Sequence, residues 1–381
     1  MVSKIKRLPT LAKVALLLLV LLLLLAAILL LIFLVPRRRT APLPPPAAPP
    51  GPADNCSSDR AVAFDFSPFL VQYRGGCVHR MDGTARVPAG VDAATGVTSK
   101  DVVINHVTGL GARMYLPPKL AAGGKKEKEK EKDLPVVVFF HGGAFVIMTP
   151  FEPKYHDYLN ALVARARVVA VSVDYRLAPE HPLPAAYDDS WAALNWAARN
   201  ADAGPEPWLR DRGNLSRLFL AGDSAGANIA HNMAMRAGSG SGLEGGAAIL
   251  GVLLLDPYFW GKRPVGAETR DPATRRRYEE TWSFVCGGRY GIDDPLINPL
   301  AAPASALRRL ACARVAVTTS GLDNFEARGE AYAAALNGSG WRGEVVRYET
   351  AGERHVYFLD QPASPKSARE LAFAAAYLSR E

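Results

Sequence analysis

The sequence has only four cysteines among its 381 residues, and no two of them lie close together. Zinc sites and thioredoxin-like centres are marked by closely spaced cysteine pairs, so neither class is indicated. The even number permits disulfides without requiring them. We interpret the four residues as free, mainly structural thiols: Cys56, Cys77, Cys286 and Cys312.

Acidic residues are absent from the first 39 positions, which hold seven lysines and arginines. This segment accounts for nearly all of the formal net charge of +8, so the rest of the chain is close to neutral. A near-neutral body offers no positive surface to a phosphate backbone, and we therefore exclude nucleic-acid binding.

An unbroken run of 22 apolar residues, Val14–Val35, follows the first basic side chains. As a helix it would span roughly 33 Å, close to the thickness of the hydrocarbon core of a bilayer. A cleaved signal peptide is the alternative, but its apolar core is normally only about 7–15 residues and a small-residue cleavage site follows it. Pro36 and three arginines follow here, so we predict an uncleaved single-pass anchor over residues 1–36.

The side of the membrane on which the body lies is predicted from flanking charge. Four basic side chains precede the apolar run and three follow it, a bias that favours a lumenal body in the endoplasmic reticulum or secretory pathway. Three glycosylation acceptor patterns, beginning at Asn55, Asn214 and Asn337, point the same way. Translocating Arg37–Arg39 is disfavoured, so a cytosolic body stays the alternative.

The proline-rich stretch 37–59 predicts a semi-rigid linker, and a globular pattern begins at residue 60. Apolar, β-rich runs then alternate with helical stretches. Strands are predicted at Pro135–Phe140, Val168–Val173, Leu218–Ala221, Ile249–Leu255, Val315–Thr319 and Val345–Tyr348, and helices at Tyr187–Asn200 and Ala225–Arg236. This pattern predicts one α/β domain over 60–381, with a mostly parallel central sheet flanked by helices. A tract of alternating lysine and glutamate at 125–133 is interpreted as a solvated loop insertion.

The clearest catalytic motif is Gly222-Asp223-Ser224-Ala225-Gly226, between the predicted strand Leu218–Ala221 and a predicted helix. In this context G-x-S-x-G is typical of a nucleophilic serine on a tight turn, whose outer residues must lack side chains. Ser224 would stand at a helix N-terminus, where backbone N–H groups favour developing negative charge. An incidental turn is the alternative, because the bare pattern occurs by chance.

A second motif, His141-Gly142-Gly143-Ala144, follows the predicted strand Pro135–Phe140. Consecutive glycines let backbone N–H groups point into a cleft, where acyl transfer needs donors for an oxyanion. We predict that Gly142, Gly143 and Ala225 supply these donors. His141 is expected to hold the loop by hydrogen bonding and to take no catalytic part.

A serine nucleophile needs a base and an acid that orients the base, both at the carboxyl ends of later strands. Asp323 follows the predicted strand Val315–Thr319, and His355 follows Val345–Tyr348. The chain order Ser224, Asp323, His355 is that of α/β-hydrolase triads. Asp256, after the Leu255 strand end, is the alternative acid.

Several segments of the chain match one family in order along the sequence. Besides the motifs above, they are Phe64–Phe69, Asp174–His181, Asp256–Trp260 and Asp294–Pro299. From about Phe64 to its end the chain resembles the plant carboxylesterases of the hormone-sensitive-lipase branch of α/β-hydrolases. The resemblance implies hydrolysis of small carboxylic esters without a cofactor or metal, and a lid to which residues 60–115 contribute along with the first strands.

The chain departs from this family in two places. Ala144 stands where the family's loop usually has a third glycine, which puts the substrate range in doubt. The membrane anchor is the other departure, since the plant relatives are typically soluble; it resembles the mammalian arylacetamide deacetylases of the same branch, which face the endoplasmic reticulum lumen.

Other functions are known on the same fold. Gibberellin receptors resemble this chain, but that resemblance implies a non-catalytic residue in place of the histidine, whereas His355 is present here. A dehydratase-type lyase is a further alternative, because the branch includes enzymes acting on isoflavonoid precursors, some with a threonine nucleophile. A membrane scaffold with an inert body fits poorly with a complete triad. The oligomeric state is not predicted.

Overall fold

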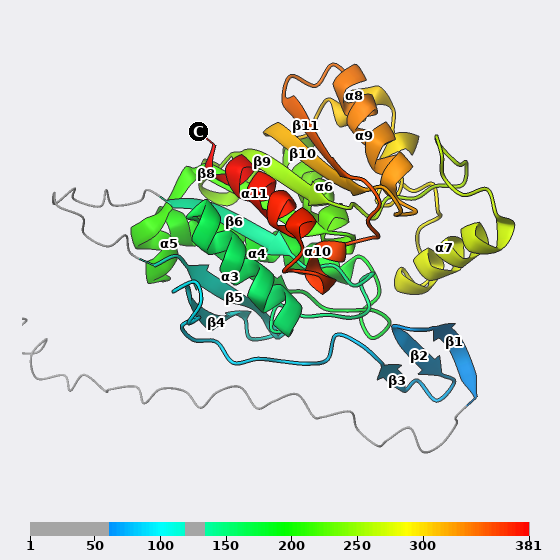
Figure 1. Cartoon of the computed structure of the whole chain (residues 1–381), viewed down its shortest axis with the longest axis horizontal. Coiled ribbons are helices and arrows are strands. Elements are labelled where there is room, and N and C mark those ends of the chain that lie inside the picture. Colours follow the sequence, from blue (N-terminus) through cyan, green and yellow to red (C-terminus); the bar gives the residue numbers. More distant parts are fainter. Residues whose placement is uncertain (1–60, 119–133, 381) are drawn as a thin grey trace, which may run out of the picture. The chain divides into compact units, whose positions relative to one another are not determined.

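The main element of the computed structural model, which describes residues 61–118 and 134–380, is an eight-stranded sheet (Figure 1). Its order is β11-β10-β9-β8-β6-β7-β5-β4, parallel from β11 to β7 and antiparallel at β5 and β4. The bounds are β4 Thr98–Asn105, β5 Leu110–Leu116, β6 Leu134–Phe140, β7 Val169–Asp174, β8 Gly213–Asp223, β9 Ile249–Leu255, β10 Cys312–Ser320 and β11 Glu344–Thr350. The predicted α/β fold with a mostly parallel sheet is confirmed.

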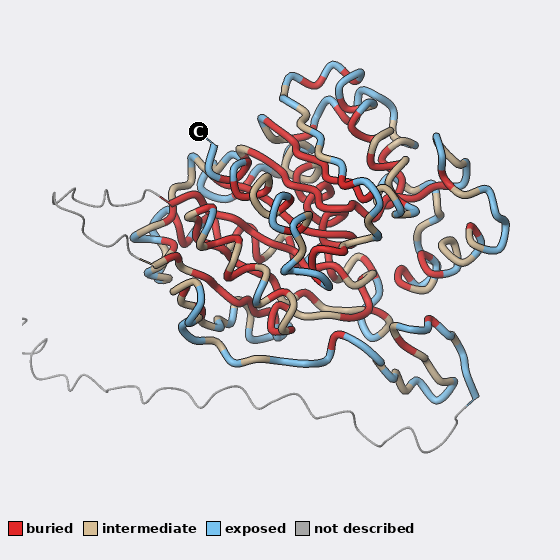
Figure 2. Tube along the Cα trace, viewed as in Figure 1, coloured by how far each residue is buried: buried red, intermediate tan, exposed pale blue. Residues whose placement is uncertain are grey.

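Helices cover both faces of this sheet because its central strands are apolar on both sides. In β6, Val136 and Val138 join one buried cluster with side chains of α4 and α6, while Val137 and Phe139 join another with α3 and α11. Figure 2 shows the buried chain concentrated in these strands. The helices are α3 Pro153–Ala166, α4 Ala185–Asp202, α5 Pro207–Arg212, α6 Ala225–Arg236, α7 Pro272–Val285, α8 Ala304–Leu307, α9 Glu326–Gly338, α10 Tyr357–Asp360 and α11 Pro365–Ser379.

A separate antiparallel sheet of three short strands precedes the main one: β1 Val62–Phe66, β2 Leu70–Tyr73 and β3 Val78–Arg80. Phe64 stacks on Phe284 of α7 with ring centroids 4.0 Å apart. Arg80 forms an ion pair with Glu180 and donates to the carbonyl oxygen of Val146. These contacts join the small sheet to α7 and to the loops that follow β6 and β7.

Cys77, in the turn between β2 and β3, is disulfide-bonded, which corrects the expectation of free thiols throughout. Cys286 and Cys312 are free, as expected. The sequence did not indicate this bond, because disulfides join cysteines that are close in space and these need not be close along the chain.

No helix within residues 61–118 and 134–380 combines the length and apolar character that a membrane span needs. The predicted anchor (1–36), the linker (37–59) and the lysine–glutamate tract (125–133) lie outside the described residues. Asn55, the first glycosylation acceptor, lies outside them too.

A buried ionic cluster holds the long connection between β9 and β10. Arg328 of α9 donates to Glu268 from two nitrogens, at 2.6 and 2.8 Å, and the side chains of both residues are at most 1% exposed. Arg328 also donates to Asn298, and Arg275 of α7 approaches Glu268 at 3.4 Å. Glu268 is the carboxylate that both arginines share. The cluster therefore joins α7, α9 and the loops between them.

We predict that Glu268→Gln lowers the free energy of unfolding by about 3–5 kcal/mol, because it leaves two buried guanidinium groups without their carboxylate. Urea denaturation of the purified domain measures the loss. Glu330→Gln is the control, since Glu330 lies on α9 with a side chain 37% exposed and pairs with Arg347. That change should stay within about 0.5 kcal/mol. Equal losses in the two variants would show that the buried cluster contributes no more to the free energy of unfolding than an exposed ion pair does.

Candidate active site

Ser224 occupies a sharp turn between β8 and α6, with backbone φ of 52° and ψ of −117°. The glycines on either side make this turn feasible. A Cβ added to Gly222 or Gly226 would lie less than 3.0 Å from the carbonyl oxygen of Phe140 in β6. Because no side chain fits there, the turn needs glycine at both positions, as the motif predicted.

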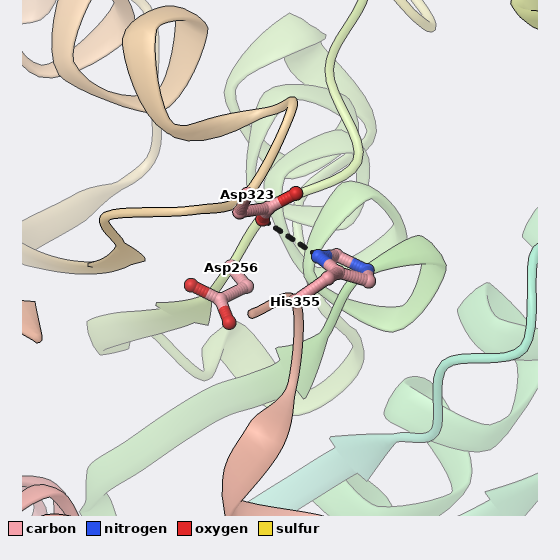
Figure 3. A group of neighbouring side chains, drawn as sticks. All are labelled: Asp256, Asp323 and His355. Atoms are coloured by element: carbon pink, nitrogen blue, oxygen red, sulfur yellow. Dashed lines mark hydrogen bonds and ion pairs between the residues drawn. The ribbon is translucent and has the colours of Figure 1, made fainter. Parts of the chain in front are cut away.

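The structure brings the three predicted catalytic side chains together. Nε2 of His355 lies 2.8 Å from Oγ of Ser224, and Nδ1 of the same ring lies 2.6 Å from Oδ2 of Asp323. Figure 3 shows the second of these contacts. Asp323 follows β10 and His355 follows β11, so both come from the carboxyl ends of neighbouring parallel strands. The three groups form one continuous line of hydrogen bonds.

Charge around the imidazole stabilises its protonated form. Burial by itself lowers the pKa of His355, but the charge and the hydrogen bond of Asp323 outweigh that effect and raise the pKa above its ordinary value. The carboxyls of Asp256 and Asp223 act in the same direction. An imidazole in this setting is a stronger base than a free one.

Asp256, the alternative acid, makes no hydrogen bond to the imidazole within the described residues. Its Oδ2 accepts the backbone N–H of Val356 and the hydroxyl of Ser320, each at 2.8 Å. In Figure 3 only Asp323 is joined to the His355 ring. The geometry therefore favours Asp323 as the acid.

The loop after β6 differs in one respect from the prediction for the oxyanion donors. The N–H of Gly142 donates to Oη of Tyr155 at 2.8 Å and to Oδ1 of Asp223 at 3.0 Å. This N–H is already used within the protein, which contradicts its predicted role. A glycine is still required, because an added Cβ would collide with the carboxylate of Asp223.

The next two residues of the loop turn back with positive φ, 97° at Gly143 and 51° at Ala144. Among the hydrogen bonds of the described chain, none uses the N–H of either residue. Ala225 is the first residue of α6, so its N–H has no carbonyl partner inside the helix. The sequence analysis did not name Ala144 as a candidate donor, because the motif alone does not show which N–H groups form hydrogen bonds within the protein.

His141 has the supporting role that the sequence predicted. Its ring stacks on Tyr175 with centroids 4.2 Å apart, and Tyr175 donates its hydroxyl to the backbone oxygen of His141 at 2.6 Å. Burial lowers the pKa of His141 to about 4, so the ring is neutral near pH 7. Together with Tyr155, these contacts hold the loop from inside the core.

Two groups of side chains in the described chain have donor atoms close enough for a metal: Asp256, Asp323 and His355, and a second made of Glu326, Glu330 and Glu349. In the first, both ring nitrogens and Oδ2 of Asp256 are occupied by hydrogen bonds within the protein. In the second, Glu330 pairs with Arg347. Neither arrangement resembles an open ligand set.

Comparisons with known proteins agree with this geometry. A family model described as the alpha/beta hydrolase fold matches residues 137–359. The chain is 44% identical over 306 residues to probable carboxylesterase 2 of Arabidopsis thaliana, a match covering 80% of this chain and 93% of that protein. It is 38% identical over 309 residues to a 2-hydroxyisoflavanone dehydratase of Glycine max, covering 80% and 94% respectively. The solved esterase LipW from Mycobacterium marinum matches with a TM-score of 0.59 and 27% identity, over 75% of this chain and 82% of that one.

The chain therefore belongs to the α/β-hydrolase family, within the plant carboxylesterases of its hormone-sensitive-lipase branch. It is a carboxylic ester hydrolase, in keeping with esterases both among its sequence relatives and among its structural neighbours.

We predict that Gly226→Ala destabilises the protein by about 1–3 kcal/mol or more and abolishes esterase activity, because the new methyl group must push β6 and α6 apart. Thermal unfolding and initial rates on an aryl ester measure the two effects. Gly338→Ala is the control, since nothing lies within 4 Å of a Cβ added at that position. If Gly226→Ala has the same stability and rate as the control, the conclusion that no side chain fits in this turn is wrong.

Proposed function

We propose that the chain hydrolyses small carboxylic esters through a Ser224–His355–Asp323 triad and an acyl-enzyme intermediate. One observation carries the proposal: an unbroken hydrogen-bonded line from Asp323 through His355 to a serine on a strained strand–helix turn. The function and the fold of the relatives support it.

The reaction follows from this geometry. As Oγ of Ser224 attacks the ester carbonyl, Nε2 of His355 takes the hydroxyl proton, and Asp323 stabilises the imidazolium through Nδ1. His355 then gives the proton to the leaving alcohol, and the acyl group stays on Ser224 as an ester. Water attacks that ester while His355 again takes a proton, which releases the carboxylic acid and restores the serine.

The oxyanion is held, in this proposal, by the backbone N–H groups of Gly143, Ala144 and Ala225. The first two lie in the left-handed turn after β6 and the third begins α6, where the helix dipole adds to the attraction. Gly142 instead supports the loop through Asp223 and Tyr155. Ala144, where the family's loop usually has its third glycine, keeps the backbone N–H group and adds a methyl group to the loop.

A dehydratase-type lyase is the second candidate, because one relative is named 2-hydroxyisoflavanone dehydratase. Ser224 lies within hydrogen-bonding distance of an imidazole, which favours nucleophilic attack over simple proton removal. A hormone receptor would not need this contact. Covalent labelling by a fluorophosphonate separates a receptor from an enzyme, since only an activated serine reacts with the probe, and release of a carboxylic acid from an ester separates the esterase from the lyase.

The small sheet β1–β3 is proposed as part of a lid over the site. Its contacts with Phe284 of α7 and with Glu180 place it against two segments that follow strand ends of the main sheet. The membrane anchor at residues 1–36 and a lumenal body are likewise proposals. The disulfide at Cys77 supports the lumen, because disulfides persist in oxidising compartments.

We predict that Ser224→Ala or His355→Ala lowers kcat for p-nitrophenyl acetate by about 10⁴–10⁶-fold, because each change removes a bond-making group. Asp323→Asn should lose roughly 10⁴-fold by analogy with the acid of serine proteases. Circular dichroism verifies that each variant is folded, and fluorophosphonate labelling of the wild type locates the reactive serine. A Ser224→Ala or His355→Ala enzyme within tenfold of wild type would refute the triad.

The topology proposal predicts that expression in a eukaryotic cell yields a glycosylated protein. Asn337 is exposed at the end of α9, whereas Asn214 is half-buried and accepts two hydrogen bonds from Ser216. Endoglycosidase treatment should therefore increase gel mobility, with a larger contribution from Asn337 than from Asn214. The shift should vanish when Asn55, Asn214 and Asn337 are all changed to glutamine. No shift, together with digestion of the body by protease outside sealed microsomes, would place it in the cytosol.

A further inference from the structure

Asp256 lies where the ends of three neighbouring strands meet. It follows β9 directly, with φ of 43°, and its backbone N–H donates to the carbonyl oxygen of Thr318 in β10 at 3.1 Å. The residue is 1% exposed. A buried carboxylate at this position is costly unless it has hydrogen-bonding partners, so its partners indicate what it does.

A single oxygen of this carboxylate binds the loops that carry both the acid and the base. Oδ2 accepts the hydroxyl of Ser320, the last residue of β10 and three positions before Asp323. The same oxygen accepts the backbone N–H of Val356, the residue directly after His355. Val356 has φ of 47°, an unfavourable value for a β-branched residue, so this peptide needs an external partner to hold it.

Among the described residues, the other backbone hydrogen bonds between these two loops do not reach Val356. The N–H of Gly321 donates to the carbonyl oxygen of Thr350 at 3.0 Å and the N–H of Leu322 to that of Glu353 at 2.8 Å, both before His355. Within the described chain, Oδ1 of Asp256 has no hydrogen-bond partner. Retaining a half-satisfied carboxylate is unfavourable for stability, and a role in the site explains why an acid is found here.

We propose that Asp256 is a positioning residue, which holds the Val356 peptide and thereby keeps the imidazole of His355 between Ser224 and Asp323. The inference rests on the proposed triad and assigns Asp256 no contact with substrate. Its carboxylate makes no hydrogen bond to the imidazole (Figure 3), so its effect on the ring passes through the Val356 peptide. A displacement of about 1 Å at a reacting group can cost about 10²-fold in rate.

The test compares two changes at Asp256 by steady-state kinetics on p-nitrophenyl acetate. Asp256→Ala removes the acceptor for Val356, so kcat should fall about 10–100-fold while KM changes less than about threefold. Asp256→Asn keeps an oxygen acceptor of the same shape and should restore kcat to within about fivefold of wild type. Unchanged kcat in Asp256→Ala would overturn the inference, and so would equal losses in both variants.

Glu370→Gln is the matched control. Glu370 lies on α11, is 2% exposed and accepts the hydroxyl of Thr318 at 2.8 Å, but it contacts none of the three triad residues. Its kcat should stay within about twofold of wild type even where its melting temperature falls as far as that of Asp256→Ala. If kcat falls equally in the control, the loss reflects general destabilisation and the inference is wrong.

Further outcomes separate this inference from the function on which it rests. Wild-type protein that neither hydrolyses the ester nor reacts with a fluorophosphonate would refute both. An active wild type, with Asp256→Asn losing roughly 10⁴-fold and Asp323→Asn active, would make Asp256 the triad acid and overturn the positioning role. Should Asp256→Ala not fold, Asp256→Gly removes the same acceptor while suiting the φ of 43° at this position, and a wild-type kcat there would overturn the inference.

Discussion

The close packing of two backbones at the end of β6 determines where the nucleophile lies relative to the loop after β6. Gly226, in the first turn of α6, lies so near the carbonyl oxygen of Phe140 that no side chain can intervene. Since β6 and β8 are paired in parallel, this approach places Ser224 beside the loop that begins at His141. The nucleophile and the N–H groups proposed for the oxyanion are thus positioned by one steric constraint, which costs no side-chain entropy when substrate arrives.

The order of strands in the sheet supplies the remaining parts. β9, β10 and β11 are consecutive parallel neighbours beyond β8, so the residues after each of them meet on the same side of the sheet as Ser224. Asp256, Asp323 and His355 come from these three ends. Buried carboxyls accumulate there, and burial raises the pKa of Asp223 to about 7. The site therefore combines an imidazole whose pKa is raised by neighbouring carboxyls with buried carboxyls whose own pKa values are raised by desolvation.

The sequence was sufficient to predict the fold and the strand ends that bring Ser224, Asp323 and His355 together, because both depend on local patterns. All six predicted strands are strands of the main sheet, and the helix predicted at Ala225–Arg236 has those bounds. The antiparallel edge, β4 and β5, was predicted only as first strands without bounds, since β4 is half-exposed and Arg113 interrupts the apolar run of the buried β5. The Cys77 disulfide was not predicted, and the donor role expected of Gly142 was wrong.

By itself, the sequence determined which residues are the candidates for catalysis, since the glycines around Ser224 and the strand ends before Asp323 and His355 follow from spacing along the chain. Only the tertiary structure decided how hydrogen bonds are shared among residues far apart in that chain. The N–H of Gly142 is shared by Tyr155 and Asp223, which lie 13 and 81 positions away, and the N–H of Val356 is taken by Asp256, 100 positions away. Each N–H group donates in one direction, and the acceptor that lies in that direction is fixed only when the strands pack.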